Sequence, residues 1–145
     1  DLNQDTAYFS SDRSGNFEIY TIKRPGETSI SNWLSGTYSP ATLVDSLNST
    51  SADKCPFVFR KIMVFASDRP GGFGGYDLYY AIYKNGKWST PENFGPDVNT
   101  ASDEYRPILG LLPNYTNYML LFSSNRSGGK GGFDLYFRGM SFDKN

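Results

Sequence analysis

The sequence contains no histidine and only one cysteine, Cys55. Without histidine, the chain cannot hold a Ser-His-Asp triad, a Cys-His dyad or a His-ligated zinc or iron ion. One cysteine allows neither an internal disulfide nor a thiolate metal cluster. No apolar run approaches the roughly 20 residues that a transmembrane helix needs. We therefore expect no metal site, no cofactor and no membrane-spanning segment in this chain.

The chain also lacks an excess of charge of either sign. Fourteen Lys and Arg residues balance fifteen Asp and Glu residues, so the formal net charge is -1. Binding to the phosphates of a nucleic acid needs a marked positive excess, and we expect no nucleic-acid partner. The length of 145 residues is that of one ordinary domain.

Aromatic residues, glycine and proline are abundant instead. Eleven Tyr, eleven Phe and two Trp make up 17% of the chain, together with fifteen Gly and eight Pro. Aromatic residues favour β-strands, whereas Gly and Pro mark turns. No segment has a helical period longer than a turn or two. The composition therefore predicts an all-β fold of short strands and tight connections.

One pattern occurs three times: YFSSDRSGNFEIY, VFASDRPGGFGGYDLYY and LFSSNRSGGKGGFDLYF. Each copy has two apolar residues, a small pair, Asp or Asn, and Arg, followed by a Gly-rich stretch and an aromatic-acid-Ile/Leu-Tyr sequence. Asp12 and Asp68 are 56 positions apart, and Asp68 and Asn125 are 57 apart. We divide the single domain, 1–145, into repeat units of roughly 1–52, 53–102 and 103–145.

The segments between the three copies match more weakly. The aligned pairs are Trp33 with Trp88, Pro40 with Pro91, Asn48 with Asn99, and Asp53 with Asp103. In this alignment Cys55 stands where the third unit has Tyr105, and we interpret Cys55 as a small buried filler.

Each unit is predicted to form four antiparallel strands. Residues 61–67 and 76–84 should form a hairpin around DRPGGFGG, and residues 118–124 and 133–138 its equivalent. Asn85-Gly86 favours a type I′ turn into a further strand, and CPFVF supplies a first strand. Residues 76–84 are apolar on both faces, as in a sheet packed between two others.

Stacked four-stranded sheets with a period near 50 residues are typical of a β-propeller. The chain holds about two and a half to three such blades. Propellers close with four to eight blades, which at this period takes roughly 225 to 450 residues. We therefore expect either a segment of a longer propeller or a ring that other chains complete, and we favour the segment.

The FSSDR sequence, the Gly-rich loop and DLY resemble the WD40-like repeat of TolB-type β-propellers. The phrase FASDRPGGFGGYDLYYAIYKNGKWSTPENFGPDVNTASDEYRP is similar almost throughout to the version in exported proteins of Bacteroidetes-like bacteria, often beside OmpA-type domains. The resemblance implies a location in the periplasm, in the outer membrane or at the cell surface. It also implies a non-enzymatic interaction module whose partners are envelope proteins or glycans.

The repeated Asp-Arg pair has two interpretations. It could form a ring of charges around a ligand channel. We favour a structural role, in which Asp accepts N–H groups of its own loop while Arg pairs with an acid such as Asp77 or Asp134. The residues assigned to loop closure are Asp12, Arg13, Asp68, Asp77 and Asp134.

The Gly-rich loops do not fit calcium, phosphate or Asp-box motifs, and we interpret them as hairpins with positive φ at several positions. Their aromatic and basic residues form the candidate binding face. That set comprises Arg69, Phe73, Tyr76, Arg126, Lys130 and Phe133.

Acids are the remaining catalytic candidates. Asp53, Asp103 and Glu104 could form a carboxylate pair for glycoside hydrolysis, so part of a propeller-type glycan-active hydrolase is the alternative function. Because Asp53 and Asp103 align as equivalent turn residues, we assign no catalytic residue and expect a binding module.

Overall fold

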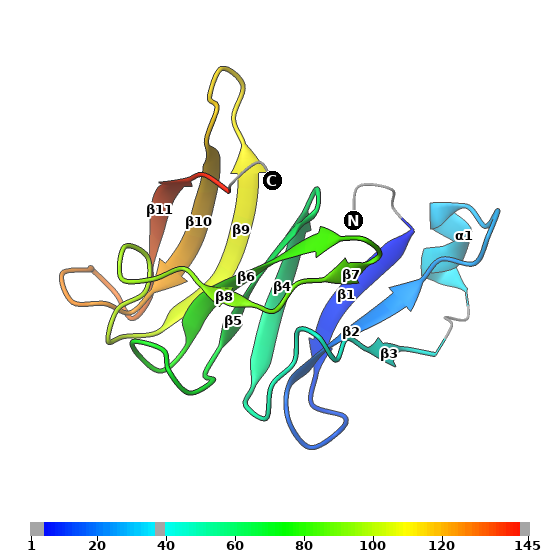
Figure 1. The fold of residues 1–145 in the computed structure, drawn as a ribbon, viewed down its shortest axis with the longest axis horizontal. Coiled ribbons are helices and arrows are strands. Elements are labelled where there is room, and N and C mark those ends of the chain that lie inside the picture. The colour runs from blue at the N-terminus through cyan, green and yellow to red at the C-terminus, as the bar shows by residue number, and fades with distance from the viewer. Residues whose placement is uncertain (1–4, 37–39, 143–145) are drawn as a thin grey trace.

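Three antiparallel β-sheets lie side by side in the computed structural model, which describes residues 5–36 and 40–142 (Figure 1). None of the sheets closes on itself. The prediction of an all-β chain is confirmed, since the described helix content is one short segment.

Among the described residues, the first sheet has three strands, as the third has, whereas four were predicted for each unit. It contains β1 (Thr6–Ser11), β2 (Glu18–Lys23) and β3 (Thr42–Leu43), with β2 in the centre. Between β2 and β3 lies the helix α1 (Ile30–Ser35), which Ser29 caps by accepting a hydrogen bond from the N–H of Asn32.

The second sheet has five strands. They are β4 (Asp53–Phe59), β5 (Ile62–Ser67), β6 (Asp77–Lys84), β7 (Lys87–Trp88) and β8 (Glu92–Asn93). The predicted hairpin is confirmed: β5 pairs with β6 from Ile62 opposite Ile82 to Ser67 opposite Asp77. The turn into β7 is also confirmed, because Asn85 and Gly86 have φ values of 55° and 81°, as a type I′ turn requires.

The third sheet contains β9 (Glu104–Leu111), β10 (Tyr118–Ser124) and β11 (Asp134–Met140). β10 and β11 form the second predicted hairpin. Both first strands, β4 and β9, contain an irregularity in register just before a proline. The residue at that bulge has positive φ, 55° at Cys55 and 50° at Arg106. Cys55 therefore corresponds to Arg106, and its alignment with Tyr105 is wrong by one residue.

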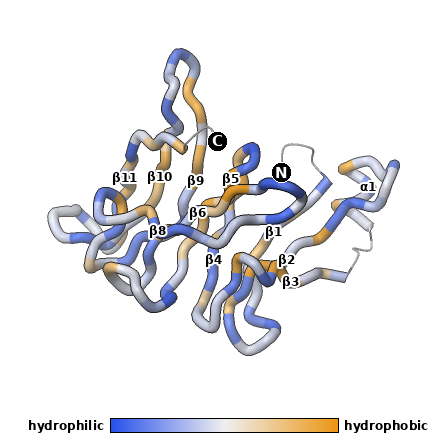
Figure 2. The backbone as a smooth tube through the Cα atoms, in the orientation of Figure 1, coloured by the Kyte–Doolittle hydropathy of each residue, from blue (hydrophilic) through white to orange (hydrophobic). Residues whose placement is uncertain are grey.

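Two hydrophobic clusters fill the spaces between the sheets. Met63, Phe65 and Tyr79 of the second sheet pack towards Ile19 of the first. Val64 and Leu78, on the opposite face, pack against Leu109, Leu120 and Phe122 of the third. The expectation that residues 76–84 lie between two other sheets is confirmed. Hydrophobic residues occur along strands of all three sheets (Figure 2).

The alignment of the two tryptophans is wrong. Trp33 is buried in α1, whereas Trp88 lies in β7, with ring centroids 5.8 Å from Tyr8 and 5.1 Å from Tyr83. The first unit has a helix where the second has the Asn85-Gly86 hairpin, so the two side chains occupy different places. Among residues 5–36 and 40–142, no helix has the length and apolar character needed to cross a membrane.

Candidate functional site

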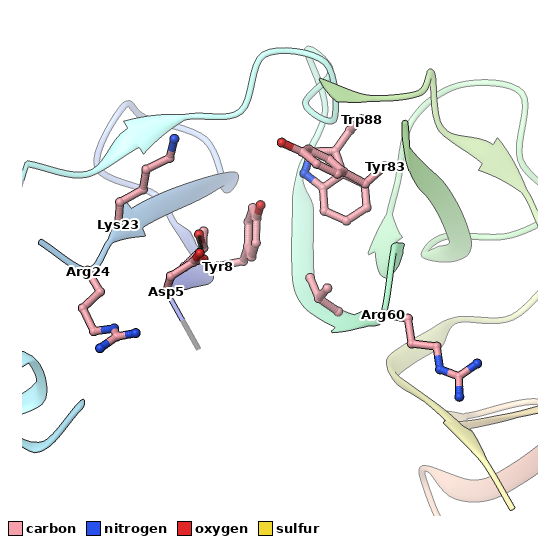
Figure 3. Close-up of a pocket in the computed structure, with 9 residues that line it drawn as sticks. Asp5, Tyr8, Lys23, Arg24, Arg60, Tyr83 and Trp88 are labelled. Carbon is pink, nitrogen blue, oxygen red and sulfur yellow. Dashed lines mark hydrogen bonds between the residues drawn. The ribbon is translucent and has the colours of Figure 1, made fainter. Parts of the chain in front are cut away.

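A polar cavity of about 300 Å³ lies between the first and second sheets. Its lining includes Tyr8 and three cationic residues, Lys23, Arg24 and Arg60. Figure 3 shows Arg24 and Arg60 on opposite sides of the view, with their guanidinium groups well separated. The Arg24 guanidinium donates to the Thr28 carbonyl at 2.5 Å. Burial raises the pKa of the Tyr8 phenol above its ordinary value. The cations do not converge on one point, so the cavity offers no built anion site.

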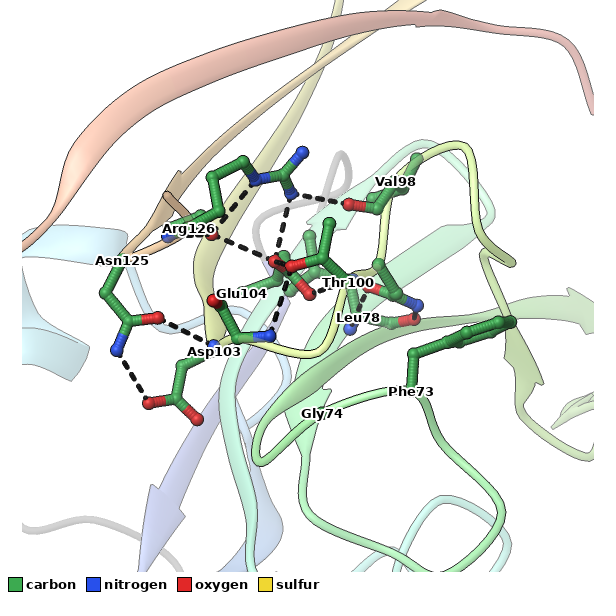
Figure 4. A network of polar contacts seen from close by, with 12 residues as sticks. Phe73, Gly74, Leu78, Val98, Thr100, Asp103, Glu104, Asn125 and Arg126 are labelled. Carbon is green, nitrogen blue, oxygen red and sulfur yellow. Dashed lines mark hydrogen bonds and ion pairs between the residues drawn. The ribbon is translucent and has the colours of Figure 1, made fainter. Parts of the chain in front are cut away.

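A second polar centre joins the second and third sheets (Figure 4). Its middle is the Glu104 carboxylate, which is fully buried. This carboxylate accepts hydrogen bonds from the N–H (2.8 Å) and hydroxyl (2.7 Å) of Thr100 and from the Ser124 hydroxyl (2.9 Å). Arg126 completes the set with an ion pair of 3.0 Å. A buried carboxylate is stable only when it is paired in this way.

Arg126 also holds the two sheets together. Its Nη2 donates to the carbonyl of Val98, in the linker between the sheets, at 2.6 Å. Its guanidinium lies over the rings of Phe122 and Tyr136, 5.2 and 4.6 Å from their centroids. We call this arrangement of arginine, buried acid, linker carbonyl and two rings an arginine joint.

A second arginine joint connects the first and second sheets. Here Arg69 pairs with buried Asp53 at 2.5 Å and donates to the Leu47 carbonyl at 2.8 Å. Asp53 also accepts from the N–H and hydroxyl of Ser49. Arg69 lies over the rings of Phe65 and Tyr79.

The predicted partner of Arg69 is therefore wrong. Asp77 is not its partner, because the guanidinium stacks on its own sheet and points into the gap between sheets. Asp77 instead accepts the loop N–H groups of Phe73 (2.7 Å) and Gly74 (3.0 Å). Asp68, expected to bind that loop, accepts the N–H of Ala52 at 2.7 Å.

The third unit repeats this division of roles. Asp134 accepts the N–H groups of Lys130 (2.9 Å) and Gly131 (3.2 Å), while Arg126 turns away to Glu104. Asp134 and Asp77 are thus the residues that order the Gly-rich loops. In the shorter first loop, the backbone carbonyl of Asp12 accepts the Gly15 N–H at 2.9 Å.

Asp53 corresponds to Glu104, not to Asp103. Asp53 lies opposite Ser67 in its sheet, and Glu104 lies opposite Ser124. The offset of 51 that matches Asn48 with Asn99 would have revealed this equivalence in the sequence. Both asparagine side chains bond to both backbone groups of one strand residue, Ile19 or Leu78, so their match is confirmed.

The acids of the hydrolase alternative are not brought together at an open cleft. Asp53 and Glu104 are fully buried in separate arginine joints. Asp103 accepts from the N–H of Tyr76 (2.9 Å) and from the Asn125 amide (3.0 Å). Each of these carboxylates is therefore engaged by donors of its own chain.

The expectation of positive φ at several positions of each Gly-rich loop is wrong for the middle loop. In the middle loop, only Gly71 has a positive φ, 91°. Gly74 is needed because an added Cβ would lie 2.0 Å from the backbone oxygen of Ser102. Close contacts also explain Gly75, which lies against the Asp103 carboxylate of the next linker, and Gly72, which lies against the Asp77 carboxylate of its own hairpin.

The candidate binding face is divided by the fold. Arg69 and Arg126 belong to the arginine joints, and Lys130 and Phe73 are exposed on their loops. Tyr76 and Phe133 are the two members that share one cavity, of about 650 Å³.

That cavity is predominantly aromatic and apolar, with two charged residues at its wall. It is lined by Tyr76, Asp103, Tyr105, Arg106, Ile108, Ser123, Phe133 and Leu135. The Tyr76 and Tyr105 rings meet edge to face, with centroids 5.4 Å apart. The pKa of Tyr105 is raised to about 12. Burial is the largest cause, and a hydrogen bond with Cys55 is the second.

The outer face of the third sheet is an exposed apolar surface. Leu135 and Phe137 of β11 are 74% and 75% exposed, and Ile108 of β9 is 48% exposed. These side chains lie on the side of the sheet opposite Leu109, Leu120 and Phe122. Large apolar patches of this kind mark interaction surfaces.

No protein-family model matches the chain, and no curated protein matches it at a significant level.

Proposed function

We propose that this chain forms part of a WD40-like β-propeller and acts as a non-enzymatic interaction module of the cell envelope, with a protein as its partner. It would be exported to the periplasm, the outer membrane or the cell surface, as the sequence resemblance implies. The single observation that carries the proposal is the exposed outer face of the third sheet.

The equivalent face of the second sheet supports this interpretation. Leu135 stands opposite Ser123 as Leu78 stands opposite Ala66, so the two leucines occupy the same place in their sheets. Leu78 is completely buried by the third sheet, whereas Leu135 is 74% exposed. A face of this composition is therefore suited to receive another β-sheet, either a further blade or a partner protein.

The polar chemistry also favours binding over catalysis. Asp53 and Glu104 are occupied by arginine, serine or threonine donors and face the interior of the joints. A glycosidase needs two carboxyl groups on either side of the scissile bond. The described acids do not offer that arrangement, which gives the hydrolase alternative no support.

A glycan is the second candidate ligand, because of the aromatic cavity. Tyr76, Tyr105 and Phe133 supply ring surfaces on which a sugar could stack, and Asp103 and Arg106 supply hydrogen-bonding groups beside them. This candidate predicts that soluble glycan fragments of the envelope perturb the fluorescence or NMR signals of Tyr76 and Tyr105.

Site-specific photo-crosslinking tests the protein-binding proposal. A photoreactive phenylalanine analogue replaces Phe137 on the outer face in the cells that make the protein, and a matched control replaces exposed Lys87 on the hairpin of the second sheet. We expect a discrete protein adduct or an intramolecular crosslink from position 137 only. Equal labelling from both positions, or none from position 137, would contradict the proposal.

A further inference from the structure

Arg13 has half of the contacts that define an arginine joint. Its Nε donates to the Ser11 hydroxyl at 3.2 Å, as Arg69 and Arg126 donate to Ser67 and Ser124 at 2.9 and 3.1 Å. Its guanidinium lies over the rings of a strand pair of the first sheet. The rings are those of Phe9 and Tyr20, with centroids 5.4 and 4.8 Å away.

The other half of the joint is not supplied by the part of the chain that the structure describes. Arg69 and Arg126 each donate through Nη2 to a linker carbonyl and to a buried acid. Within residues 5–36 and 40–142, Arg13 has neither contact, and it is exposed where the other two arginines are half-buried. A cation is thus held by two rings and a hydroxyl on the outer face of the first sheet.

We propose that Arg13 is the docking residue of a third arginine joint, whose occupant is the acidic linker of a further repeat unit. The two complete joints define the chemistry of that occupant. Their linkers are LNSTSAD and VNTASDE. Both begin with Leu or Val followed by Asn, have Ser or Thr at the third position and Ser at the fifth, and end with Asp or Glu. The carbonyl of the first residue and the final carboxylate both bind the arginine.

Each part of this pattern has a physical reason. The Ser or Thr donates its N–H and hydroxyl to the acid, which reduces the cost of burying a carboxylate. The Asn pairs with the backbone of the neighbouring strand and fixes the linker over the sheet. The proposal rests on the repeat architecture of the proposed function, but it concerns the first sheet and not the outer face of the third.

An extended chain tests this directly. Ser11 and Ser124 are equivalent and lie 113 positions apart. A second copy of residues 53–113 is therefore placed directly before Asp1. The added Glu104 then precedes Arg13 by the same number of residues as Glu104 precedes Arg126. In the extended chain, thermal unfolding compares three variants: Arg13→Met, Glu104→Gln of the added copy, and the two together. Arg13→Met is also measured in the unextended chain.

We expect Arg13→Met to lower the Tm of the extended chain as much as Arg126→Met does, and to change the Tm of the unextended chain little. The double variant should lose no more than either single variant. Equal effects of Arg13→Met in both chains, or additive effects of the two substitutions, would overturn the proposal. Association of the unextended chain that Arg13→Met abolishes would assign the face to a second copy and would also overturn it.

A peptide provides a measurement that does not depend on folding of the added unit. A peptide of residues 94–105, which carries Val98, Thr100 and Glu104, is titrated into the unextended chain. We expect shifts of the NMR signals of Phe9, Ser11 and the Arg13 side chain, and at least a tenfold weaker response with the Glu104→Gln peptide. Absence of these shifts, together with absence of coupling in the extended chain, would reject the proposal while leaving the crosslinking test of the third sheet unaffected.

Discussion

The second and third sheets carry the same repeat but differ in what covers them. Leu78 of the second sheet is completely buried because the third sheet lies on it, and its counterpart Leu135 is 74% exposed. The side chains are identical, so their burial depends on the neighbour alone. The same residue therefore acts as core in one sheet and as candidate interaction surface in the next.

The two arginine joints provide a second comparison. In the second sheet Asp53 accepts from Ser49 and Arg69, whereas in the third the longer Glu104 reaches Thr100, Ser124 and Arg126. Both acids are fully buried. The longer acid gains a donor from the neighbouring strand, so it depends less on its arginine.

The largest effect is expected when the arginine is removed from a joint. Arg69→Met leaves the Asp53 carboxylate buried without a cation, which should lower the free energy of unfolding by about 3–5 kcal/mol. Arg126→Met should cost less, because Glu104 keeps its Thr100 and Ser124 donors. Urea unfolding of both variants measures the difference.

Arg138→Met is the matched control for these arginines. Arg138 forms an exposed pair with Asp97 at 2.8 Å, which should contribute no more than about 1 kcal/mol. If Arg69→Met were as mild as Arg138→Met, the joint would not be a determinant of stability.

The two leucines should respond differently to truncation. Leu78→Ala should cost about 2–5 kcal/mol, because it leaves a cavity between the second and third sheets. Leu135→Ala should change the unfolding free energy by less than about 0.5 kcal/mol in the chain studied alone. Chemical denaturation gives both values, and a large loss for Leu135→Ala would mean that another surface covers this face in solution.

Equivalent glycines sharpen the comparison of the loops. Gly74→Ala places a Cβ against the Ser102 backbone oxygen and should cost about 1–3 kcal/mol. Gly131 occupies the same place in the third loop, but an added Cβ has nothing within 4 Å. Gly131→Ala should therefore stay within about 0.5 kcal/mol of the parent in a thermal melt. Similar losses would contradict the linker contact at Gly74.

The smallest effect concerns Tyr105 and is confined to alkaline pH. Its pKa is raised from 10 to about 12, mainly by burial, so the folded state binds its proton more tightly than the unfolded state does. Its contribution to stability is complete below pH 10 and is lost as the pH rises towards 12. The difference in tyrosinate absorbance between the parent and Tyr105→Phe measures this titration.

Cys55→Ala separates the causes of the Tyr105 shift. Burial should keep the pKa raised, while loss of the hydrogen bond with Cys55 should lower it part of the way. A Tyr105 titration at the ordinary pKa in the parent would show that the ring is not buried against Tyr76.

The repeated hairpins could be predicted because their information is local. Apolar and aromatic segments on either side of a Gly-rich loop, together with the Asn85-Gly86 turn, are enough to specify strands that are adjacent in sequence. The side-chain partners were harder to predict. Asp77 is near Arg69 in sequence and has the right charge, but the acid that binds Arg69 is Asp53, on the first strand of the sheet.

The sequence by itself determined three similar groups of antiparallel strands, with an apolar pattern on both faces of the middle one, since strand and turn preferences act over a few residues. Only the tertiary structure decided which acids are buried, that a Cβ atom cannot be accommodated at Gly74, and which apolar face is exposed. These properties depend on contacts between sheets, where a shift of one residue moves a carboxylate from the surface into a joint. The burial of Asp53 and Glu104 was therefore decided by packing between sheets, and the exposure of Leu135 by the absence of a covering sheet among the residues that the structure describes.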